Sequence, residues 1–134
     1  MKILIAISSC RRDARNGYND ALRETWLKDI PVEYRFFIGD GTPTNDNEQA
    51  IAASQTGGDT NRGIDYAAKG KASVISAAAE PPLEPKDDEI ILAVPDDYRH
   101  IAVKVRGIFQ YALSHGFDYV FKCETDSYVV VERL

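Results

Sequence analysis

The chain has 134 residues, 44% hydrophobic and 28% charged, which is ordinary for a globular protein and predicts a single domain over residues 1–134. A formal net charge of −5 argues against nucleic acid or an anionic membrane as the main partner. No apolar run reaches the roughly 18–20 residues of a membrane span. The two cysteines, Cys10 and Cys123, are too few for a disulfide framework, so free thiols and a cytosolic, reducing location are expected.

The first part of the chain predicts a strand, a helix and a second strand. Residues 2–8 are a continuous apolar run, typical of a strand covered on both faces. A helix is expected from about residue 16 to residue 28, ended by Pro31, because apolar side chains recur there at helical spacing. The expected buried stripe is Tyr18, Ala21, Leu22, Thr25 and Trp26. Residues 34–38 form the second strand, closed by a turn with Asp40 at its apex.

The segment 42–86 has few large apolar side chains and shows no strong periodicity. Short helices are expected around 47–54 and 71–79. A segment of this length within one domain is either functional or poorly ordered.

The alternation of strand and helix resumes at residue 89. Residues 89–94 predict a third buried strand, residues 95–98 a turn, and the following residues a long helix to about residue 114, with Gly116 as its stop. The expected buried stripe of this helix is Ile101, Val105, Ile108, Phe109 and Ala112. A fourth strand begins at Tyr119. The whole pattern predicts an α/β fold, a mostly parallel sheet with helices on both faces.

Polar residues follow several of these strands, at the sheet edge where ligands bind in such folds. Ser8 and Ser9 are small enough to let a ligand approach the backbone. The cationic candidates for phosphate are Arg11, Arg12 and Lys104. Solvated surface is the alternative for the arginines, and snorkelling from a buried helix face is the alternative for Lys104. Asp40 could accept a hydrogen bond from a ribose or base, or simply stabilise an Asp-Gly turn.

Two carboxylates near the end of the expected fourth strand form a candidate metal site. Glu124 and Asp126 are separated by Thr125, so they share a face if the strand continues through them. Mg²⁺ and Mn²⁺ prefer such oxygen ligands. The alternative is a strand that ends in a solvated acidic turn.

Four blocks of sequence resemble one enzyme family, the β-1,3-galactosyltransferase-like glycosyltransferases that include the fringe proteins. Residues 96–104, DDYRHIAVK, resemble that family's D-S-Y-x-N-L-T-L-K, and residues 122–129, KCETDSYV, resemble its DxD motif, K-x-D-D-D-x-Y/F-V. Residues 21–26, ALRETW, and 36–39, FFIG, resemble its A-I-R-x-T-W and F-L-L-G blocks. The blocks occur in the family's order and span most of the chain outside 42–86.

The resemblance implies a GT-A fold, a Rossmann-like nucleotide-sugar domain. It also implies transfer of a hexose from a UDP-sugar to a glycan or another hydroxyl acceptor, with Mn²⁺ or Mg²⁺ bridging the diphosphate and the acids. By position Asp126 matches the last acid of the motif, Glu124 the first, and Thr125 the middle one. First and fourth strands would then be neighbours, with both cysteines near the nucleotide.

The sequence departs from the family in three respects. The motif reads Glu-Thr-Asp, and the family's acceptor site and catalytic base follow the DxD strand, whereas this sequence ends at Leu134, so no residue can be matched to the base. The membrane anchor of Golgi members has no counterpart in it, which suggests a viral or bacterial relative or an excised domain. Two alternatives therefore stay open: a non-catalytic nucleotide-sugar-binding module, and an unrelated metal-dependent phosphoesterase.

Overall fold

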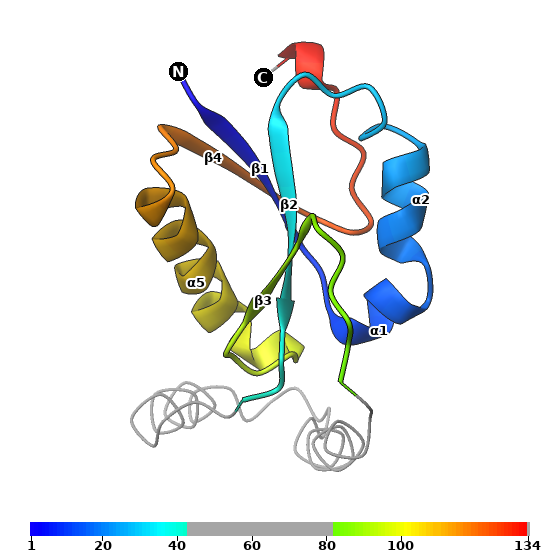
Figure 1. Cartoon of the computed structure of the whole chain (residues 1–134), viewed down its shortest axis with the longest axis vertical. Helices are drawn as coiled ribbons and strands as arrows, with labels where there is room; N and C mark the ends of the chain where they lie inside the picture. The colour runs from blue at the N-terminus through cyan, green and yellow to red at the C-terminus, as the bar shows by residue number, and fades with distance from the viewer. Residues whose placement is uncertain (43–81, 134) are drawn as a thin grey trace, which may run out of the picture.

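Four parallel strands form the sheet of this protein, whose computed structural model describes residues 1–42 and 82–133 (Figure 1). The strands are β1 (Ile3–Ser8), β2 (Glu33–Gly39), β3 (Glu89–Leu92) and β4 (Tyr119–Glu124). Their order is β3-β2-β1-β4, and every neighbouring pair is parallel. This is an α/β fold with Rossmann-like topology, which confirms the predicted fold class, including the adjacency of the first and fourth strands.

Helices cover both faces of the sheet, as Figure 1 shows. One face carries α5 (Ile101–Ser114), which is preceded by the short 3-10 helix η2 (Tyr98–His100). The other face carries α1 (Arg11–Arg15) and α2 (Tyr18–Glu24), and the chain ends beyond β4 in η3 (Val131–Arg133). No helix in the described part of the chain is long and apolar enough to cross a membrane.

The alternation of side chains along β1 divides the core into two layers. Leu4 and Ala6 pack with Phe37 and Ile108 under α5. Ile5 and Ile7 face the other way, in the cluster that contains Leu22 of α2 and Phe36. Because β1 is central and fully covered, its apolar run was readable from the sequence.

The expected single helix over 16–28 is wrong in extent and in orientation. Gly17, at φ 81°, separates α1 from α2, and α2 already ends at Glu24. Within α2 the buried residues are Asn19 and Leu22, whereas Tyr18 of the expected stripe is 52% exposed. Asn19 faces inward because its amide is satisfied there: it accepts from Ser9 Oγ and donates to Glu89 Oε1.

The third and fourth strands are shorter and more exposed than expected. β3 ends at Leu92 and lies at the edge of the sheet, so Ile91 is 37% exposed. β4 ends at Glu124, whose carbonyl accepts a hydrogen bond from the Ser127 amide at 3.1 Å and closes a turn.

The buried face of α5 differs from the expected one at one residue: Phe109, expected to face the core, is 48% exposed, while Ile108 and Ala112 are buried as expected. The helices expected at 47–54 and 71–79 lie outside the described residues.

Gly39 is required where the end of β2 meets the segment after β3. A Cβ at this position would lie 2.7 Å from the Val94 carbonyl oxygen and 2.9 Å from that of Pro95, both backbone atoms. We expect Gly39→Ala to lower the free energy of unfolding by about 2 kcal/mol, since the two segments would have to separate. Urea denaturation measures this. The matched control is Gly107→Ala, whose Cβ would meet only the tip of the Leu92 side chain at 3.0 Å. Equal stability of the two variants would contradict the prediction.

Candidate functional site

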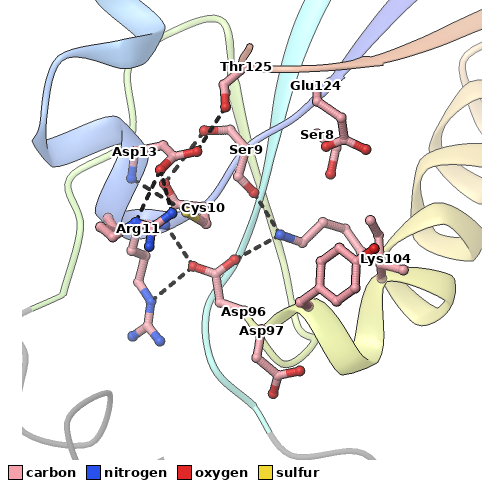
Figure 2. Close-up of a pocket in the computed structure, with 13 residues that line it drawn as sticks. Ser8, Ser9, Cys10, Arg11, Asp13, Asp96, Asp97, Lys104, Glu124 and Thr125 are labelled. Atoms are coloured by element: carbon pink, nitrogen blue, oxygen red, sulfur yellow. Dashed lines mark hydrogen bonds and ion pairs between the residues drawn. The ribbon is translucent and has the colours of Figure 1, made fainter. Parts of the chain in front are cut away.

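A cavity of about 480 Å³ opens at the carboxyl ends of β1 and β4 (Figure 2). The parallel register pairs Ser8 with Glu124, so the residues that follow both strands meet at one edge of the sheet. The cavity is lined by Ser8, Ser9, Cys10, Arg11, Arg12, Asp13, Asp96, Asp97, Tyr98, Ile101, Lys104, Glu124 and Thr125. Its volume is within the range of small-molecule sites.

The loop after β1 is held rigidly on the floor of this cavity. Ser8 and Ser9 are 6% and 4% exposed, and the Ser9 amide donates to the Phe37 carbonyl at 2.9 Å. Cys10 caps α1, with its sulfur accepting from the Asp13 amide at 3.4 Å. Ser8 and Ser9 therefore line the cavity with small side chains on a hydrogen-bonded loop.

A buried ion pair between Asp96 and Lys104 ties together the segments around the cavity. The Asp96 carboxylate, 4% exposed, accepts from Lys104 Nζ at 2.8 Å, from the Gly39 amide at 3.1 Å and from the Arg11 amide at 2.7 Å. Lys104 Nζ also donates to the Ser9 carbonyl at 2.6 Å. Figure 2 shows the two side chains meeting between the β1 loop and α5. Lys104 thus lines the cavity while its ammonium group contacts the Ser9 carbonyl and the Asp96 carboxylate.

The two arginines of the β1 loop differ in what they can reach. Arg11 is 12% exposed, and its Nε lies 3.5 Å from the Asp96 carboxylate. Arg12 is 79% exposed, and its Nε donates to Asp13 at 3.3 Å. Of this pair, Arg12 has the more exposed guanidinium.

Of the acidic segment Glu124–Asp126, only Glu124 and Thr125 line the cavity. Glu124 lines it and forms an ion pair with Lys122, and Thr125 Oγ1 donates to Asp13 Oδ2 at 2.8 Å. Asp126 is exposed in the turn after β4 and is outside the lining set. The strand therefore does not continue through Asp126, and the condition for two carboxylates on one strand face is not met.

Asp40 also lies outside the lining set. It is exposed, and its Oδ1 accepts from the Thr42 amide at 2.7 Å, the hydrogen bond of an Asx turn. This contact corresponds to the turn alternative for Asp40.

The donor set near the acidic turn bears on the predicted metal. Among residues 1–42 and 82–133 no group of three or more His, Cys, Asp or Glu side chains could hold an ion. Glu124 and Asp126 supply carboxylate oxygens of the kind that Mn²⁺ and Mg²⁺ take. A cation at this turn would fit only if oxygens of a bound ligand completed its coordination.

Both cysteines are free thiols, as predicted. Burial raises the pKa of Cys10, and burial, followed by the neighbouring Glu124 carboxylate, raises the pKa of Cys123 to about 11. Cys123 is a residue of β4 and is buried in the core cluster that contains Ile5, Ile7 and Leu22. A raised pKa favours the protonated thiol in both groups. In this structure the Cys10 sulfur caps α1 and Cys123 packs in the core.

Six of the lining residues were not predicted from the sequence as site residues: Cys10, Asp13, Asp96, Asp97, Tyr98 and Ile101. One signal for Asp96 was available, because it and Lys104 are the two ends of the block that resembles D-S-Y-x-N-L-T-L-K. The ion pair brings those two ends together.

Comparison with known proteins adds no relative to this picture. No protein-family model matches the chain, and neither a search of curated proteins nor one of solved structures finds a match.

Proposed function

We propose that this domain binds the donor of a metal-dependent glycosyltransferase, a UDP-sugar, in the cavity at the carboxyl ends of β1 and β4. The observation that carries the proposal is the composition of this cavity. It brings Ser8, Ser9, Arg12, Lys104, Glu124 and Thr125, all selected from the sequence, to one place beside a rigid backbone loop. The location is the usual ligand position in a parallel α/β sheet.

The charge of the cavity supports the metal requirement. Four carboxylates line it, from Asp13, Asp96, Asp97 and Glu124, against three cations, from Arg11, Arg12 and Lys104. Two of these cations are already close to Asp96. A diphosphate placed there would meet more negative than positive charge, so an additional cation would favour its binding.

Glu124 and Asp126 are the residues that would hold this cation together with phosphate oxygens. When bound, the cation would stabilise negative charge on the departing UDP as a Lewis acid. Arg12 would contact the same phosphates, and the fixed loop at Ser8 and Ser9 would orient the nucleotide.

Titration calorimetry with UDP tests the proposal. We expect Mn²⁺ to strengthen binding by about tenfold or more, and Asp126→Asn to remove that gain, since the amide keeps the shape and loses the charge. Glu132→Gln, the same chemical change at an exposed residue of η3, is the control and should leave binding unchanged. UDP binding that is independent of metal and unaltered in Asp126→Asn would reject the proposal.

A further inference from the structure

The cavity has one aromatic lining residue, Tyr98, whose exposure sets it apart from the floor beneath it. Tyr98 is 88% exposed, whereas Ser8, Ser9 and Lys104 are at most 6% exposed. With Ile101, it gives the cavity an apolar side on a site that is otherwise mostly polar.

The backbone that carries Tyr98 is fixed on both sides. Asp97 caps η2, with its carboxylate accepting from the His100 amide at 3.1 Å and lying 2.8 Å from His100 Nδ1. The Ile101 amide donates to the Tyr98 carbonyl and continues the turn into α5. An anchored backbone with an exposed ring is a preorganised contact surface, because little backbone freedom remains to be lost on binding.

The ring itself is unused by the described part of the protein. Within residues 1–42 and 82–133 the Tyr98 ring takes part in none of the aromatic pairs and none of the side-chain hydrogen bonds. Trp26, Tyr34, Phe36, Phe37 and Tyr111, by contrast, each have a ring partner. A tyrosine that packs on no other ring and borders a ligand-sized cavity has its whole face available for a flat ring.

We infer that Tyr98 is the stacking platform for the nucleobase of the bound nucleotide. This inference rests on the proposed function for the presence of a nucleotide and adds the residue that recognises its base. In this arrangement Arg12 and the loop after β1 contact the phosphates, and the Tyr98 ring at η2 stacks on the base. Stacking on one ring face selects for a flat aromatic ring and not for a particular hydrogen-bonding edge.

Two ligands separate the base from the rest of the nucleotide: UMP, and ribose 5-phosphate, which lacks the base. Tyr98→Ala should weaken UMP binding by about tenfold or more and leave ribose 5-phosphate binding unchanged, while Tyr98→Phe should keep UMP binding within about twofold. Tyr119→Ala is the matched control, an exposed tyrosine of β4 that does not line the cavity, and it should alter neither affinity. The melting temperatures should be unchanged, since the ring is exposed.

The outcomes distinguish this inference from the proposed function. Unaltered UMP binding in Tyr98→Ala, or an equal loss for UMP and ribose 5-phosphate, overturns the stacking role. A selective loss of UMP binding, in a protein whose UDP binding gains nothing from Mn²⁺, keeps the stacking role and rejects the metal-dependent function. Absence of both UMP and UDP binding to the wild-type protein rejects both.

Discussion

Replacing Asp96 by alanine is expected to lower the free energy of unfolding by about 3–5 kcal/mol. The carboxylate is 4% exposed and accepts from donors on three segments: the Arg11 amide, the Gly39 amide and Lys104 Nζ. Its removal leaves the Lys104 ammonium, 6% exposed, without its carboxylate. An uncompensated buried charge costs more than the pair itself contributes, so the loss should be large.

A double-mutant cycle makes the Asp96 prediction specific. Lys104→Met alone should also be strongly destabilising, because it leaves the Asp96 charge buried with only the Arg11 group and two amides. The double variant should lose at least about 1 kcal/mol less than the sum of the single variants, since it removes both charges together. Asp126→Ala, at an exposed position, should stay within about 0.5 kcal/mol of wild type in the same chemical denaturation assay. Additive effects, or an Asp96→Ala variant as stable as Asp126→Ala, would contradict an electrostatic tie at this position.

The sequence was sufficient for the sheet because its strands are local patterns. The apolar run that forms β1 is buried on both faces, and a continuous run of apolar residues is recognisable without knowing its distant partners. The stop of α5 was likewise readable, because Gly116 has φ 68° and supplies the left-handed residue that ends a helix. Elements of this kind carry their structural signal within a few residues.

Features that depend on distant partners were not readable in the same way. Asn19 is polar and does not belong to the expected buried stripe of its helix, but Ser9 and Glu89, the latter 70 residues away, satisfy its amide inside the protein. Asp96 was predicted only as part of a turn. Its role in the core could not be predicted locally, because the amides that donate to it, of Arg11 and Gly39, lie 85 and 57 residues away in the sequence. The turn at Asp126 depends on the Ser127 amide closing onto Glu124, which a two-residue periodicity cannot reveal. The sequence therefore predicted the position of the site at the carboxyl ends of the strands, but not the long-range hydrogen bonds around it.

The polar cluster on Arg23 should make the protein sensitive to acid. Arg23, 18% exposed, donates to Asp88 at 2.5 Å and to Glu89 at 2.9 Å, and also to Asp20 at 2.6 Å. Burial would raise the pKa values of Asp88 and Glu89, but hydrogen bonds, from Arg23 and Tyr34 to Asp88 and from Arg23, Asn19 and the Lys86 amide to Glu89, together hold both pKa values below their usual range. The unfolded chain therefore binds more protons than the folded one as the pH falls through the usual range of about 4 to 4.5. The stabilisation is complete above that range and is lost as the pH falls toward the folded-state pKa values.

Arg23→Met is expected to cost about 3 kcal/mol of unfolding free energy at pH 7, because Glu89 is 3% exposed and would keep its charge without a cation. In this variant the two carboxylates lose the contribution of Arg23 that lowers their pKa values, while burial still raises them, so their folded-state pKa values should be higher than in the wild type. The stability difference between wild type and variant should therefore shrink as the pH falls from 6 to about 3.5. Denaturation at a series of pH values measures it, with Arg133→Met, at an exposed position of η3, as the control. A difference that stays constant over this range would show that Arg23 stabilises the fold by packing, over the ring of Phe36 at 4.8 Å, and not through its carboxylates.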